Sequence, residues 1–120
     1  CIGLTVNFAT NPEAMLTAAD RIVFQVDDGD SNIDCVTEKD GTATTTDSGI
    51  DVASGTAVTL GFHVKSTGSV EFFVNRNKVA THTDNIPDDE NLAMGAMQLS
   101  GSATGTKSMN IDYMFAAQVR

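Results

Sequence analysis

The residues best suited to chemistry in this sequence are its carboxylates, and two of them have the spacing of a catalytic pair. Glu38 and Asp40 stand two positions apart, which puts both side chains on one face of a β-strand. Two carboxylates on one face can act as acid and base in glycoside hydrolysis. The pair ends at an Asp40-Gly41 turn signal, however, and position 43 is Ala43 rather than a third acid. Solvated charge at a turn explains this spacing, and we predict no catalytic residue.

Two further acidic clusters could bind a cation. Asp27-Asp28-Gly29-Asp30 and Asp88-Asp89-Glu90 offer the oxygen ligands that calcium prefers. Neither has the spacing of an EF-hand loop, so we interpret both as solvated turns. His63 falls on the polar face of a predicted strand and His82 near the end of another, without a third ligand at metal spacing. We therefore expect surface histidines and predict no metal and no other cofactor.

Motifs for nucleophilic catalysis and nucleotide binding are missing from the sequence. Its serines lie in predicted loops without a G-x-S-x-G elbow, and its glycines form neither a P-loop nor a dinucleotide-binding fingerprint. The two cysteines, Cys1 and Cys35, are too few for a disulfide framework, and no C-x-x-C spacing indicates a metal site. We expect free thiols, with one bridge between the two cysteines as the alternative.

Length and charge limit the remaining classes of function. The 120 residues suffice for one hydrophobic core, so we predict a single domain over 1–120. Sixteen acidic and seven basic residues give a net charge of −9, which would repel nucleic-acid phosphates and anionic lipid headgroups. No apolar run approaches the roughly 18 residues of a membrane span. Because the sequence opens at Cys1 rather than Met, we expect it to be truncated at its N-terminus.

Alternation of apolar and polar residues is the main structural signal. Residues 58–64 carry an apolar side chain at every second position, which predicts a half-buried strand. Residues 70–74 repeat the pattern after a polar break at 66–69, so the two strands should pair antiparallel. The stretch Asn75-Arg76-Asn77-Lys78 predicts a tight hairpin to a strand over Val79–Thr83, because asparagine tolerates the left-handed backbone of such turns.

A third hairpin is signalled by Asp40-Gly41, a favoured pair for a type I′ turn. It would join a strand over Asn32–Lys39 to a threonine-rich strand over Thr42–Thr46, which we place at a sheet edge. The other expected elements are strand Ile2–Ala9, a short helix or tight loop over 12–19 with its N-cap signal at Asn11-Pro12-Glu13, strand Arg21–Asp27, polar loop Ile86–Glu90, strand Leu92–Leu99, and a flexible connection over Ser100–Lys107.

The chain closes on its longest alternation, which predicts a central strand. This strand would carry on one face Met109, Ile111, Tyr113, Phe115 and Ala117. About eight strands, with turn signals about every 8–12 residues and little room for helix, indicate an all-β fold. We predict a two-sheet antiparallel sandwich of the jelly-roll kind.

Phe73 and Met114 depart from this pattern because each falls on the strand face opposite the predicted core. The second sheet or a segment upstream of Cys1 could cover them. Exposed apolar side chains also mark subunit contacts, so we name Phe73 and Met114 as a possible subunit interface.

Two segments of the sequence resemble concanavalin A-like domains. Phe72-Phe73-Val74-Asn75-Arg76, within Ser69–Ala80, is similar to the F-Y-V-D-G-x-x-V strand of the laminarinase and glucanase branch. Ile111-Asp112-Tyr113-Met114-Phe115, within Met109–Gln118, is similar to its closing V-D-Y-V-R-V-Y strand. The resemblance implies a concanavalin A-like jelly roll. It does not extend to activity, because the E-x-D-x-x-E triplet of the glucanases is missing and the chain has no tryptophan for stacking on a sugar ring.

Nearly the whole chain resembles virion structural proteins of tailed bacteriophages, particularly those of marine bacteria. The segments that carry this resemblance are Ile2–Val6, Val26–Asp34, Thr37–Asp40, Thr83–Glu90 and Ala117–Arg120. It implies a non-enzymatic capsid decoration or auxiliary head protein on the virion surface, with the major capsid protein and copies of itself as partners, and no direct contact with nucleic acid or membrane. The alternative is a lectin-like carbohydrate-binding module of a phage tail or fibre, with a glycan as ligand.

Overall fold

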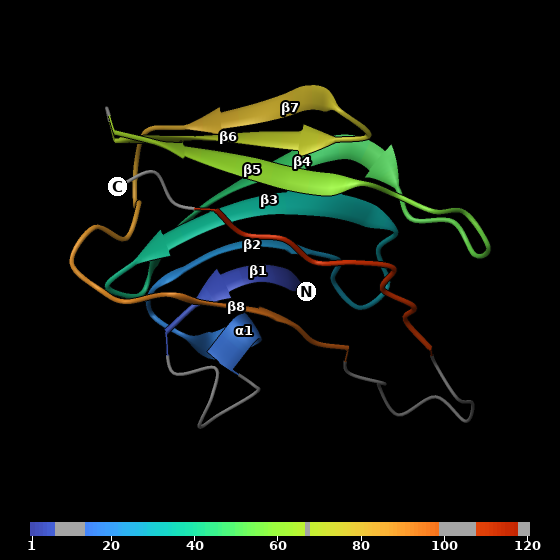
Figure 1. Ribbon diagram of the computed structural model, residues 1–120, viewed down its shortest axis with the longest axis horizontal. Coiled ribbons are helices and arrows are strands. Elements are labelled where there is room, and N and C mark those ends of the chain that lie inside the picture. Colours follow the sequence, from blue (N-terminus) through green and yellow to red (C-terminus); the bar gives the residue numbers. More distant parts are fainter. Residues whose placement is uncertain (7–13, 67, 99–107, 118–120) are drawn as a thin grey trace.

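The computed structural model describes residues 1–6, 14–66, 68–98 and 108–117. Strands within residues 2–96 form two antiparallel β-sheets packed face to face (Figure 1). The larger sheet has the strand order β4-β3-β2-β1-β8, and the smaller has the order β5-β6-β7. The elements are β1 (Ile2–Thr5), α1 (Ala14–Thr17), β2 (Arg21–Gln25), β3 (Asn32–Lys39), β4 (Thr42–Asp51), β5 (Leu60–Lys65), β6 (Ser69–Val74), β7 (Asn77–His82) and β8 (Ala93–Ala96). The predicted all-β, two-sheet antiparallel sandwich is confirmed.

The main core lies between the two sheets. At its centre the rings of Phe24 on β2 and Phe72 on β6 meet edge to face, with centroids 5.3 Å apart. The buried residues of this core are Ile22, Phe24, Ile33, Cys35, Val70, Phe72, Val74 and Ala80. A smaller core of Met15, Val23 and Val36 lies on the other face of the larger sheet, under α1. Every second residue of β6 is buried, as the alternation predicts.

The two tight turns predicted at Asp40-Gly41 and within residues 75–78 form there. Asp40 (φ 52°) and Gly41 (φ 76°) link β3 to β4, and Asn75 (φ 51°) and Arg76 (φ 68°) link β6 to β7. Two consecutive positive φ angles are the mark of a type I′ turn, whose twist matches that of the flanking strands. Because this turn uses only two residues, β7 begins at Asn77 rather than Val79. The threonine-rich β4 lies at the edge of its sheet, as expected.

The other predicted elements are present but shorter. The antiparallel pairing of β5 with β6 is confirmed, while Val58 lies before β5 rather than in it. Helix α1 falls within the predicted range 12–19, whereas the N-cap signal at 11–13 and the connection over Ser100–Lys107 lie outside the described residues. Strands β1, β2 and β8 end at Thr5, Gln25 and Ala96, before the predicted ends at Ala9, Asp27 and Leu99. Of these predicted ends, Ala9 and Leu99 lie outside the described residues.

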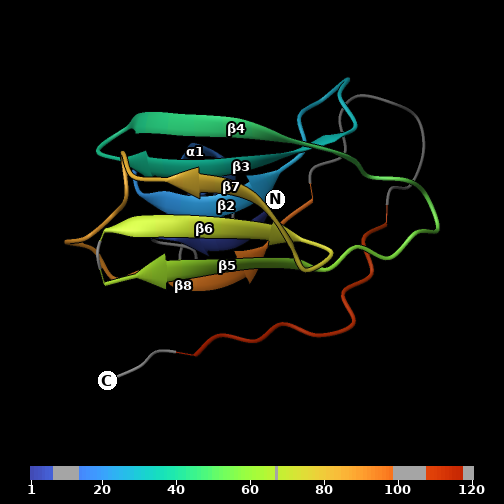
Figure 2. The same ribbon diagram turned by 90° about the horizontal axis from the view of Figure 1, so that it is seen from above.

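The predicted closing strand is wrong, because residues 108–117 are described and contain no strand. Tyr113 and Phe115, which we expected in the core, are 74% and 78% exposed. Alternation decides which side chains share a face, but a strand also needs a neighbouring backbone to complete its hydrogen bonds. In this structure the segment lies along one side of the sandwich without joining either sheet (Figures 1 and 2).

Candidate interaction surface

Phe73 lies on the outer face of β6, as the sequence predicts. Its neighbour Phe72 is fully buried in the core, whereas Phe73 is half-buried and points the other way. The residues opposite it are Gly61 on β5 and Lys78 on β7. Gly61 has no side chain, and a Cβ placed on it would meet no atom within 4 Å, so the surface beside Phe73 on β5 is open.

Met114 is 38% exposed, but the reasoning that singled it out does not hold. We placed it on the outer face of a central strand, and the structure has no strand there. Met114 is instead one of several apolar residues of the segment 108–117 that are exposed, at both odd and even positions. Phe73 on β6 and Met114 in the segment 108–117 therefore lie on different elements, and the role of each at an interface stays a prediction.

The exposed large apolar side chains of the described residues fall into two groups. The first flanks the loop between β2 and β3: Val26 begins this loop, and the backbone N–H of Val52 donates to the carbonyl of Ser31 at its other end, over 2.8 Å. The second group lies on β5, β8 and the segment 108–117, and consists of Val64, Met94, Met109, Ile111, Tyr113, Met114 and Phe115. Sequence alternation had assigned most of this second group to the core.

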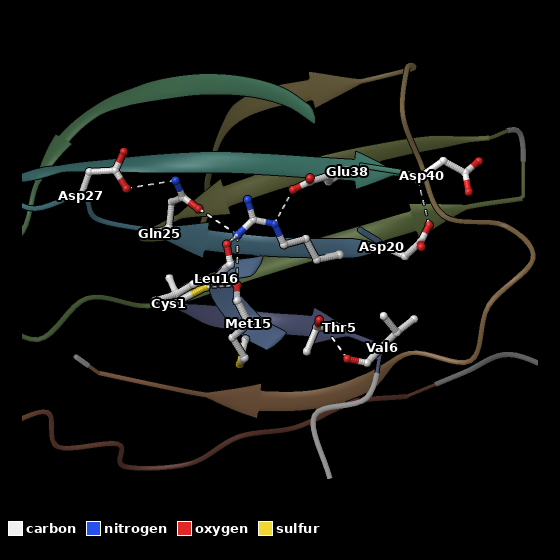
Figure 3. A network of polar contacts seen from close by, with 11 residues as sticks. Cys1, Thr5, Val6, Met15, Leu16, Asp20, Gln25, Asp27, Glu38 and Asp40 are labelled. Carbon is white, nitrogen blue, oxygen red and sulfur yellow. Dashed lines mark hydrogen bonds and ion pairs between the residues drawn. The ribbon is translucent and has the colours of Figure 1, made fainter. Parts of the chain in front are cut away.

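The Glu38–Asp40 pair is not arranged as a catalytic dyad. Glu38 accepts a hydrogen bond of 2.6 Å from Nε of Arg21, and both side chains of this ion pair are largely buried. Nη1 of Arg21 donates to the carbonyls of Met15 and Leu16 over 3.1 and 2.9 Å, so the guanidinium ties α1 to the larger sheet (Figure 3). Asp40, in contrast, is an exposed turn residue. The register of β2 against β3, which sequence reasoning did not fix, creates this contact.

The two acidic clusters differ in their surroundings. Lys39 on β3 forms ion pairs with Asp88 and Asp89, and its hydrogen bond and charge lower the pKa of the Asp88 carboxyl. Near the other cluster, burial raises the pKa of Asp34, and the neighbouring charges of Asp27, Asp47 and Asp30 raise it further. Across the described residues, no group of three or more histidine, cysteine, aspartate or glutamate side chains has the geometry of a metal site.

His82 is not the surface histidine that we predicted. It is 3% exposed and lies between the sheets, with its ring 5.0 Å from that of Phe72. Nδ1 is 2.9 Å from Oγ1 of Thr37 on β3, and Nε2 is 3.0 Å from Oγ1 of Thr46 on β4. The signal was present in the sequence, because His82 stands two residues after the core residue Ala80. His63 is exposed, as predicted.

The hydrogen bonds around His82 fix its tautomer. The single hydroxyl hydrogen of Thr37 is donated to the carbonyl of Asp84, 3.1 Å away. Nδ1 must therefore carry the proton and donate to Thr37, which leaves Nε2 to accept from the hydroxyl of Thr46. Burial lowers the pKa of His82, and the charge of Asp84 opposes this shift. The neutral ring is thus a polar link between the two sheets rather than a ligand or a catalytic base.

Both cysteines are free thiols, as predicted. Sγ of Cys1 donates to the carbonyl of Met15 over 3.2 Å. Cys35 is buried in the main core, where burial and the charges of Asp34 and Asp47 raise its pKa to about 12. A thiol with so high a pKa is a poor nucleophile, because the thiolate is the reactive species.

No known protein family, curated protein or solved structure matches this chain. In the described part of the structure, no helix is long and apolar enough to cross a membrane.

Proposed function

We propose that this chain is a non-enzymatic structural protein of a bacteriophage virion, a capsid decoration or auxiliary head protein that binds the shell in many copies. The observation that carries the proposal is the pair of separate apolar groups on an otherwise acidic surface. A protein that sits in a regular array needs one contact with the shell and another with its neighbours. Exposed apolar side chains mark such contacts.

The group formed by Val26 and Val52 is suited to the shell contact. These side chains are 42% and 47% exposed, and they flank the loop between β2 and β3. Apolar side chains surrounded by polar residues are the usual composition of a protein contact, with a polar rim around an apolar centre. The acidic residues of the loop, Asp27, Asp28 and Asp30, would form the rim and favour a basic surface on the partner.

The placement of the carboxylates supports the non-enzymatic part of the proposal. Glu38 is held by Arg21, and Asp88 and Asp89 by Lys39. A carboxylate already in an ion pair is less available as a general acid or nucleophile. Hydrolysis of a β-glucan by the full chain would overturn this part of the proposal, and we expect none.

The position and copy number of the chain in virions test the proposal directly. Cryo-electron microscopy of intact particles should show this sandwich as a regular array on the head, in numbers comparable to the major capsid protein. Purified capsids lacking the chain should then bind it back, and Val26→Ser with Val52→Ser should weaken this binding at least tenfold. The control is Thr45→Ser, a change at an exposed position on β4. Absence from the head, or equal binding of both variants, would overturn the proposed role.

A carbohydrate-binding module on a tail or fibre is the second candidate, and the exposure of Tyr113 and Phe115 favours it. Two exposed aromatic rings two positions apart could stack on sugar rings, which Phe residues in the core could not do. This function predicts retention of the chain on a host-surface polysaccharide column, lost on Tyr113→Ala and kept on Val52→Ala. A few copies at the tail tip, rather than an array on the head, would favour this candidate over the capsid role.

A further inference from the structure

At the edge of the sandwich where β5 lies over β8 (Figure 2), which we call its open side, apolar side chains on the inner faces of both sheets are only partly buried. Ile2 and Leu4 on β1 pair with Phe24 and Ile22, so they face the smaller sheet as those core residues do. Both are only partly buried, and Met94, which lies opposite Leu4 on the edge strand β8, is 38% exposed. The face of the larger sheet at β1 and β8 is therefore apolar and incompletely covered.

The edge of the smaller sheet shows the same incomplete burial. Val64 on β5 pairs with Val70, which is fully buried, yet Val64 itself is 43% exposed. Leu60 and Phe62 lie on the same face and are partly buried. Among the described residues no strand pairs with the outer edge of β5, so one row of its backbone groups is open to another strand. A strand added beside β5 would cover this face and the exposed part of β1 and β8 together.

The segment 108–117 has the properties of the missing strand. It carries an apolar side chain at positions 109, 111, 113 and 115, and all ten of its residues are exposed. Both views show it running along the open side, in the same direction as β5 (Figures 1 and 2). In its own chain the segment would have to reverse direction to pair antiparallel with β5. A second copy related by a two-fold axis across the strands presents its segment in the required direction.

We propose that residues 109–117 of one copy add to β5 of a second copy as an antiparallel strand, and that the exchange is reciprocal. Pairing Tyr113 with Phe62 places Ile111 opposite Val64 and Phe115 opposite Leu60, so the apolar faces coincide along the strand. On the outer face it places Asp112 opposite His63, one pleat away from Lys65. An acid beside these groups adds electrostatic complementarity, which helps to fix the register.

The area of this contact is large enough for a stable dimer. A Tyr or Phe side chain buries about 150–250 Å² when it is enclosed, and three quarters of Tyr113 and Phe115 is still exposed. Two copies of each ring would bury roughly 450–750 Å². The Met and Ile side chains and the accepting strands add at least as much, which reaches the range of about 1,200–2,000 Å² for specific interfaces. A two-fold axis makes the two contacts identical, as in most homodimers.

Light scattering coupled to size exclusion tests the association. We expect twice the chain mass for the unmodified protein and a monomer for Val64→Lys, because a lysine on the accepting edge opposes strand addition. The matched control is Val52→Lys, at a side chain of similar exposure outside the proposed contact, which should stay dimeric. A monomeric unmodified protein, or equal masses for the two variants, would overturn the proposal.

A cysteine cross-link separates exchange between copies from closure within one chain. One chain carries Val64→Cys and another, of different tag length, carries Ile111→Cys, both with Cys1→Ser. Cys35 is buried with a raised pKa and should not react. Oxidation of the mixture should give a disulfide-linked heterodimer. If a chain with both cysteines instead closes on itself and the mixture gives no heterodimer, the exchange is refuted. A dimer that is absent from virions would refute the proposed capsid role and leave this inference standing.

Discussion

Loss of the Thr37 hydroxyl should destabilise the fold much more than its size suggests, because this hydroxyl accepts from the buried ring of His82 and also donates to the carbonyl of Asp84. In Thr37→Val the shape of the side chain is kept, but His82 Nδ1–H loses its acceptor and the carbonyl of Asp84 loses its donor. Each buried polar group left unsatisfied costs about 1–3 kcal/mol. Because Asp84 is exposed and its carbonyl can bond to water, we count only the His82 N–H and expect the free energy of unfolding to fall by roughly 1–3 kcal/mol.

Urea denaturation followed by circular dichroism measures this loss as a lower midpoint at an unchanged m-value. Thr45→Val is the matched control, since Thr45 is exposed on the edge strand β4, and surface changes of this kind stay within about 0.5 kcal/mol. An equal midpoint for Thr37→Val and Thr45→Val would refute the tautomer and the link between sheets that we infer.

The same network predicts how stability changes with pH. Burial lowers the pKa of His82 in the folded chain, so the unfolded chain takes up a proton first, near the ordinary histidine value of about 6.5. The unfolded state then binds more protons than the folded state, and stability is lost as the pH falls through and below this value. His82→Gln should flatten the dependence between pH 8 and 6, whereas His63→Gln, at an exposed position on β5, should leave it in place.

Three further predictions concern single positions. A Cβ on Gly3 would lie 2.2 Å from the carbonyl oxygen of Ile22, so Gly3→Ala should lower the thermal midpoint of unfolding by many degrees. The control is Gly61→Ala, which should change the midpoint little because no atom lies within 4 Å of the added carbon. Arg76 holds a φ of 68°, so Arg76→Gly should raise stability to urea by roughly 0.5–1 kcal/mol; a loss would contradict the type I′ turn. The pKa of Asp34 is raised, so its ionisation removes stability as the pH rises above about 3.8. Asp34→Asn should therefore raise the urea midpoint at pH 7 in low salt, and an unchanged midpoint would contradict this interpretation.

The parts of the fold that the sequence predicts are those decided by local chemistry. Asp40-Gly41 and Asn75-Arg76 form turns where expected, because few residues accept a positive φ and Asn, Asp and Gly lead among them. The burial of Val70, Phe72 and Val74 follows from side chains that alternate across a pleated strand. Both signals are contained in fewer than ten consecutive residues.

The parts that the sequence did not predict depend on which distant strands become neighbours. Arg21 meets Glu38 only because β2 and β3 pair in one particular register, in which these two residues lie opposite each other. His82 meets Thr37 and Thr46 only because β7 of one sheet packs over β3 and β4 of the other. Alternation puts His82 on the same strand face as Ala80, which our prediction of a surface histidine overlooked, but it does not identify the groups across the core that hydrogen-bond to a buried histidine.

The segment 108–117 shows most clearly that alternation alone does not make a strand. Its exposed apolar face is also the reason to expect association between two copies. The pattern in Ile111, Tyr113 and Phe115 calls for a strand with one buried face, and the structure leaves that face exposed beside an open edge. A sequence pattern that is unsatisfied within one chain can be satisfied by another, because a strand edge accepts any backbone of suitable direction and length. The dimer then completes the burial that the single chain lacks, so its stability should rise with protein concentration, as mass action requires.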